Sequence, residues 1–65
     1  MNLPPDVMVE RLTRMARSKA QWLADFSSGR NARPSHEIEM QTQNLAALEQ
    51  ASLAYAAKAK KENAA

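Results

Sequence analysis

One stretch, residues 38–59, constrains this chain more than any other. Its positions form a stripe that recurs in alternating steps of three and four residues, namely Ile38, Gln41, Leu45, Leu48, Ser52, Tyr55 and Ala59. That alternation keeps one face of an α-helix turned toward a partner along the whole stretch. The stretch therefore predicts a long helix that packs against a second helix.

The preceding residues supply such a second helix, over about 5–27. Its central stripe and the apolar residues that widen one side are Met8, Leu12, Met15, Trp22 and Phe26, with Val9, Ala16, Ala20 and Leu23. Proline is tolerated in the first turn of a helix, as at Pro5, and Asp6 suits the positive end of the helix dipole. Gly29 is the sole glycine of the chain, and it is expected to end this helix in a left-handed conformation.

The predicted second helix runs over about 35–61, after a loop at 28–34. Ser35 is the expected N-cap, and Glu37 lies in the first turn, where a negative charge is favourable. No residue type that breaks helices occurs within 36–61, and no strand pattern occurs in the chain. Two long helices joined by about seven residues predict an all-α fold, an antiparallel αα-hairpin that forms one domain over 1–65.

The two stripes can be registered against each other in layers. The expected layers are Met8–Ser52, Leu12–Leu48, Met15–Leu45, Lys19–Gln41 and Trp22–Ile38. One layer is polar, because Lys19 faces Gln41. Lys19 has three interpretations, namely a side chain whose ammonium reaches solvent, a device that fixes the register, or a buried base or nucleophile. The first two are favoured, because catalysis would need a pocket and further groups.

The size of the chain indicates that the hairpin does not stand alone. A domain of 65 residues buries only about 60% of the surface that its unfolded chain exposes, and it usually needs a disulfide, a metal or self-association for stability. The chain has no cysteine and one histidine, so neither disulfides nor a cysteine or histidine zinc site is expected. No apolar run is long enough for a membrane span, and no secretory signal is expected. We therefore expect that self-association or a partner completes the hairpin as a helical bundle, and that the protein is cytoplasmic.

No motif predicts an enzyme, a cofactor or a metal. Ser35, His36 and Glu37 are the residue types of a catalytic triad, but neighbours on a helix diverge by about 100°. The segment that begins at His36 also fails as a zinc-protease helix, because Met40 stands where the second histidine is needed. A single glycine excludes a glycine-rich phosphate loop. The chain is therefore expected to be non-catalytic, with no small-molecule substrate.

The predicted second helix carries more apolar surface than the first helix can cover. Met40 and three alanines line one flank, and Leu53 and two alanines line the other. Rows of such residues on two flanks are typical of a surface covered by another chain. The residues expected at a protein interface are Trp22, Leu23, Met40, Ala46, Leu53 and Ala57. The partner is expected to be a second copy, as in a dimeric four-helix bundle of coiled-coil type, or a larger protein.

A nucleic-acid-binding hairpin is the alternative function. Its contacts would be Arg11, Arg14 and Arg17 on the first helix, and the net charge of the chain is +2. Phosphate binding favours one continuous basic surface with aromatic stacking partners. Here acidic residues interrupt the basic face, and the aromatic residues lie on the stripe that faces the other helix. RNA binding is therefore less favoured than protein binding.

In size and helix count the hairpin is similar to small plasmid-regulating helical hairpins and to hairpin co-chaperones of bacterial secretion needles. The architecture would also suit a small bacterial or phage accessory or inhibitor protein. These resemblances rest on architecture and on no shared motif, and architecture does not fix function. The expected function is a small helical protein-interaction module that acts as a homo-oligomer, an adaptor, a co-chaperone or an inhibitor.

Overall fold

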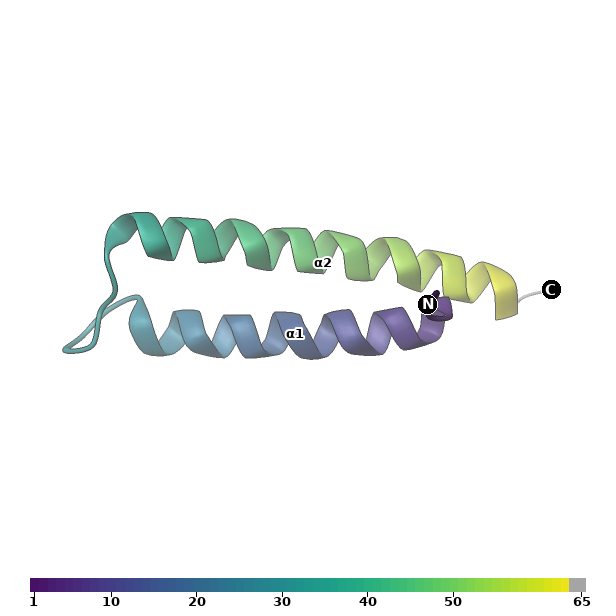
Figure 1. Cartoon of the computed structure of the whole chain (residues 1–65), viewed down its shortest axis with the longest axis horizontal. Coiled ribbons are helices and arrows are strands. Elements are labelled where there is room, and N and C mark those ends of the chain that lie inside the picture. Colours follow the sequence, from purple (N-terminus) through teal and green to yellow (C-terminus); the bar gives the residue numbers. More distant parts are fainter. Residues whose placement is uncertain (64–65) are drawn as a thin grey trace.

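The computed structural model describes residues 1–63 and contains two helices, α1 (Pro5–Phe26) and α2 (Ser35–Asn63). They run antiparallel and pack against each other, with the start of α1 and the end of α2 at the same end of the hairpin (Figure 1). Within the described residues no strand is present. The all-α hairpin predicted from the stripes is confirmed.

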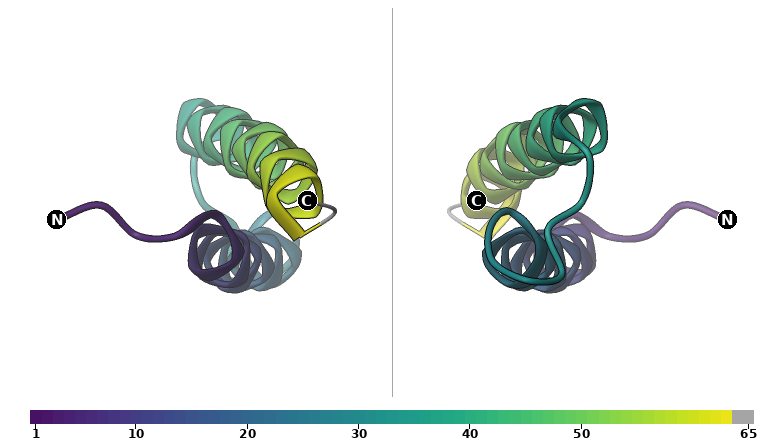
Figure 2. Two further views of the ribbon diagram at one scale, coloured as in Figure 1. Left: turned by 90° about the vertical axis from the view of Figure 1, so that its right-hand side faces the viewer. Right: turned by 90° about the vertical axis from the view of Figure 1, so that its left-hand side faces the viewer.

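The hairpin is long and thin rather than compact. It extends 51 × 22 × 15 Å, and its radius of gyration of 14.7 Å exceeds the roughly 11 Å expected for a compact domain of this length. Seen along their axes, the helices form a single pair whose members are inclined to each other (Figure 2). Each helix therefore has one helical neighbour and leaves most of its circumference to solvent.

Both helices begin directly after a proline. The Pro4 carbonyl accepts a hydrogen bond from the Met8 N–H at 2.9 Å, and Pro4 has the extended ψ of 154° that suits a cap. The Pro34 carbonyl likewise accepts from Ile38 at 3.1 Å. Pro34, and not Ser35, is thus the cap of α2, and the N-cap prediction was wrong by one residue. A proline carbonyl can start a helix because proline lacks a donor but keeps its acceptor.

The loop between the helices is fixed by backbone contacts. Ser27 N–H bonds to the Leu23 carbonyl at 3.0 Å, and Arg33 N–H bonds back to the Phe26 carbonyl at 2.9 Å, which closes the turn. Gly29 has φ of 86°, the left-handed conformation expected from the sequence. At this end the rings of Trp22 and Phe26 lie 5.2 Å apart at 41°. The closed turn and the ring pair hold the loop end of the hairpin together.

Candidate functional site

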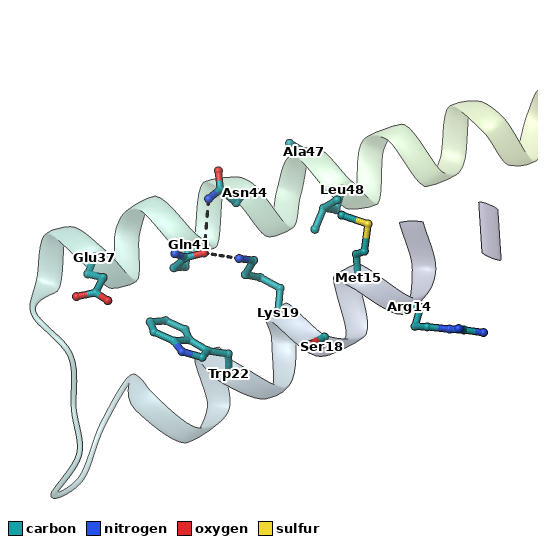
Figure 3. Close-up of a pocket in the computed structure, with 10 residues that line it drawn as sticks. All are labelled: Arg14, Met15, Ser18, Lys19, Trp22, Glu37, Gln41, Asn44, Ala47 and Leu48. Atoms are coloured by element: carbon teal, nitrogen blue, oxygen red, sulfur yellow. Dashed lines mark hydrogen bonds between the residues drawn. The ribbon is translucent and has the colours of Figure 1, made fainter. Parts of the chain in front are cut away.

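The polar layer that the sequence predicted forms in the structure. The half-buried ammonium of Lys19 donates to Gln41 Oε1 at 2.6 Å, and Asn44 Nδ2 approaches the same oxygen at 3.5 Å (Figure 3). The second distance is at the limit for a hydrogen bond, so Lys19 is the main partner. A single polar contact of this kind disfavours alignments that carry the two groups out of reach of each other, because both groups then lose their partner.

The register differs from the expected layers elsewhere. The hydroxyls of Thr13 and Ser52 lie 3.2 Å apart, so Ser52 bonds five residues beyond its expected partner Met8. Figure 3 shows the Met15 side chain pointing at Leu48, whereas Leu45 was its expected partner. Five residues are about 1.4 helical turns. The Lys19–Gln41 contact survives this offset because the long lysine stem extends toward the loop end to reach Gln41 (Figure 3).

The hairpin lacks a closed core. No side chain whose exposure is described, residues 1–62, is fully buried. Met15, expected in the seam between the helices, keeps 54% of its surface exposed. Met40 keeps 55% and Leu53 keeps 71%. Two helices alone therefore leave large apolar side chains in water, and each forgoes part of the about 1.5–3 kcal/mol that complete burial contributes.

The larger of two grooves along the seam lies on the side of Trp22, and we call it the Trp22 groove. It has a volume of about 910 Å³, and Met15, Trp22 and Leu48 supply its apolar walls (Figure 3). Lys19 and Gln41 form its polar centre. The whole lining is Arg14, Met15, Ser18, Lys19, Trp22, Glu37, Gln41, Asn44, Ala47 and Leu48. The groove thus combines apolar area with a lysine that has no carboxylate partner within the described residues.

The second groove lies on the opposite flank, and we call it the Leu53 groove. Its volume is about 410 Å³. The α1 wall is built mainly from small residues and the α2 wall from leucines, with one charged residue on each side. The whole lining is Thr13, Ala16, Arg17, Ala20, Leu45, Glu49, Ser52 and Leu53. At 100° per residue, the α1 members of the two grooves fall on opposite sides of the seam.

The structure does not gather the six expected interface residues into one patch. Trp22 is half-buried in its groove, and Leu53 is exposed in the other. Leu23 is half-buried but lines neither groove. Met40 is exposed on the flank of the Trp22 groove, whereas Ala46 and Ala57 are exposed on the flank of the Leu53 groove. The expected surface is therefore two surfaces, one on each side of the hairpin.

The three arginines considered for RNA binding are all exposed. Arg14 pairs with Glu10 at 2.9 Å on the outer face of α1, and Arg17 lines the Leu53 groove. Arg33, in the loop, pairs with Glu37 at 3.0 Å through both carboxylate oxygens. Part of the positive charge is thus matched locally, which lowers the attraction that a phosphate backbone would feel.

Chemistry-bearing groups are dispersed over the described part of the chain. In residues 1–63 no three His, Asp or Glu side chains lie close enough to hold a metal ion. His36 is exposed in the first turn of α2, and no hydrogen bond joins it to Ser35 or Glu37. Over the same residues, neither helix combines the length and hydrophobicity that a bilayer crossing requires. The described residues thus present two grooves along the seam between the helices and no cluster of metal-ligating side chains.

Sequence reasoning missed the charged pair of the Leu53 groove. Arg17 was considered only as a phosphate contact, and Glu49 was not singled out at all. The sequence does contain an indication of this pair, since Arg17 and Glu49 are both charged residues that border an apolar stripe. Such border positions select partners in helical bundles.

Comparisons with known proteins do not assign the chain to a family. No family model matches the chain, and no curated protein or solved structure resembles it significantly.

Proposed function

We propose that this protein is a non-catalytic helical interaction module whose two grooved flanks are covered by another protein chain. That chain is a second copy, a larger partner, or both in turn. The module acts by presenting α2 as an inner helix of a bundle, in the manner of an adaptor, co-chaperone or inhibitor. The cytoplasm is the compartment we propose for it, since a chain without cysteine gains no disulfide from an oxidising one.

One observation supports this proposal above the others, namely the lack of a fully buried side chain in residues 1–62. Folding costs about 1–2 kcal/mol per residue in backbone entropy alone, and burial of apolar surface is what offsets it. A hairpin that leaves Met15, Met40 and Leu53 more than half exposed forgoes much of that offset. Another chain over the flanks would recover it.

Thermal unfolding at several protein concentrations tests the proposal. If a second copy covers the flanks, the midpoint rises with concentration, because association stabilises the folded state by mass action. If a larger protein covers them, the isolated hairpin unfolds broadly and at low temperature. A cooperative, concentration-independent transition of a monomer shown by sedimentation to be stable would contradict the proposal. Circular dichroism at 222 nm reports the helicity in each case.

RNA binding is the second candidate, and no distance in the structure favours it. The Arg14–Glu10 pair and the absence of aromatic side chains from the outer face of α1 argue against a continuous phosphate-binding surface. We therefore keep RNA binding as an outcome to be tested and not as a proposal.

A further inference from the structure

We infer that the occupant of the Leu53 groove is a second copy of this chain, related by a two-fold axis that runs along the helices. In this dimer α2 of each copy lies over α1 of the other, and both loops are at the same end. The inference rests on the proposed function and specifies its partner, its surface and its orientation.

The shape of the groove fits this arrangement. The α1 wall carries Thr13, Ala16 and Ala20, whereas the α2 wall carries Leu45 and Leu53. A two-fold axis along the helices places the leucine wall of each copy on the small-residue wall of the other. Large side chains then pack on small ones, which lets helices approach closely. Leu53, 71% exposed in the single hairpin, gains a partner surface.

Charge separates this orientation from its alternative. Arg17 and Glu49 line opposite walls of the groove, and among the described residues neither makes an ion pair or a side-chain hydrogen bond. An axis along the helices brings Arg17 of each copy to Glu49 of the other, twice over. A two-fold axis perpendicular to the helices instead stacks α1 on α1 and α2 on α2. Like charges then share each wall, which is unfavourable.

The other groove fits a second copy less well. Its acidic residue Glu37 is already engaged by Arg33, and Arg14 by Glu10. Lys19 would therefore be covered without a free carboxylate, and covering an unpaired charge is costly. The Leu53 groove meets no such obstacle.

The area required is available. A stable protein interface buries about 800 Å² on each partner. That is roughly one sixth of the 5218 Å² surface of the hairpin, well within one of its flanks. Area alone does not decide affinity, so the experiments address the charges and the orientation.

Charge reversal tests the paired contacts. Arg17→Glu places two glutamates on the seam, and Glu49→Arg places two arginines there. Each variant alone is expected to raise the dimer dissociation constant about tenfold or more at low salt, measured by sedimentation equilibrium. An equimolar mixture of the two variants, or the double variant Arg17→Glu with Glu49→Arg, should recover wild-type affinity. Gln43→Glu, a charge change on the exposed face away from both grooves, is the control and should change nothing.

Orientation is measured separately with a spin label on Ser28→Cys, which introduces the sole cysteine at the exposed loop. Loops at the same end put two labels roughly two helix spacings apart, about 20 Å. Loops at opposite ends separate them by close to the 51 Å length of the hairpin. Pulsed dipolar spectroscopy distinguishes the two distances.

The outcomes separate this inference from the function on which it rests. A short label distance together with recovery in the mixed variants supports it. A dimer with a long label distance, or one whose affinity ignores both charge reversals, overturns the inference and leaves the interaction module standing. A larger partner that covers α2 of a monomeric hairpin does the same. A stable monomer with a concentration-independent transition overturns both.

Discussion

The two helices of the hairpin differ in how they distribute their apolar residues. α1 concentrates them on one face. On its outer face, polar side chains contact each other within the helix, as do Glu10 with Arg14 and Gln21 with Asp25. α2 spreads apolar and small residues around its circumference and exposes Met40 on one flank and Leu53 on the other. The single apolar face of α1 can pack against its one neighbour, α2. The apolar residues of α2 lie on several sides, and α1 can cover only one of them.

The difference shows which helix is incomplete in the single chain. An amphipathic helix is satisfied when its apolar stripe is covered. In the hairpin α2 covers part of the α1 stripe, where Leu12, Trp22 and Phe26 are half-buried, and leaves Met15 54% exposed. A helix with apolar residues on most sides is typical of the interior of a bundle. We therefore expect substitutions on α2 to divide into those that unfold the hairpin and those that abolish assembly.

The largest effect is expected at the seam. Leu48→Ala should lower the free energy of unfolding by about 1–2 kcal/mol, because Leu48 is half-buried against α1 near Met15. A small hairpin has only a few kcal/mol in total, so much of its helicity should disappear. Leu53→Ala removes the same atoms five residues further along α2 and should cost the monomer under about 0.5 kcal/mol. Urea unfolding in dilute solution compares them.

Equal losses from the two alanine variants would contradict the distinction between seam and flank. Leu53 would then contribute to the hairpin itself. The two substitutions remove the same number of atoms from the same helix, so neither helix propensity nor volume explains a difference between them.

The next effect is on assembly. Leu53→Glu should weaken association at least tenfold, which is about 1.4 kcal/mol, because it places a charge in the groove that we propose to be covered. Helicity at the same concentration should change much less. Light scattering measures the first and circular dichroism the second. Gln43→Glu adds the same charge away from both grooves and should leave association intact.

Complete loss of helicity in Leu53→Glu would mean that folding and assembly are inseparable in this chain. Unchanged association would show that the flank of α2 around Leu53 is not part of the interface. The Trp22 groove would then be the surface to test.

A smaller effect is expected at the polar layer. Replacing Lys19 and Gln41 together by leucine should raise the free energy of unfolding by about 1 kcal/mol, because a half-buried polar contact gives way to apolar packing. The same change removes the group that disfavours other alignments. The amide NMR spectrum should therefore broaden or double although the protein is more stable. Lys19→Leu alone, which leaves Gln41 in place, should do less of both.

Much of the fold was predictable because it depends on periodicity. The stripes at three and four residue steps, with Gly29 between them, gave the two helices and their antiparallel arrangement. The Lys19–Gln41 contact was predictable as well, since each stripe has a polar interruption at that level. These features repeat along the chain or stand out from their neighbours.

The exact register and the second groove were not predictable in the same way. A stripe that continues for many turns looks nearly the same after a shift of one step of three or four residues, so the sequence did not show that Met15 meets Leu48 and not Leu45. The long Lys19 side chain can reach Gln41 in the expected and in the observed register, so this contact does not distinguish the two. Arg17 and Glu49 can be recognised as charged residues on opposite walls of one groove only once that register is known.

The smallest effect is expected on the outer face of α1. Arg11→Gln with Arg14→Gln should leave folding and dimerisation through the Leu53 groove unchanged, since both side chains are exposed and neither lines that groove. An exposed pair such as Arg14–Glu10 contributes about 0.3–0.5 kcal/mol. Binding to an RNA duplex, measured by fluorescence anisotropy, should be weak and should vanish as salt rises. Tight binding that falls steeply with salt, and that the double variant weakens, would show instead that α1 has a second functional face. The contrast between the two helices would then fail, because the outer face of α1, which carries the Glu10–Arg14 and Gln21–Asp25 contacts, would also be a surface for a partner.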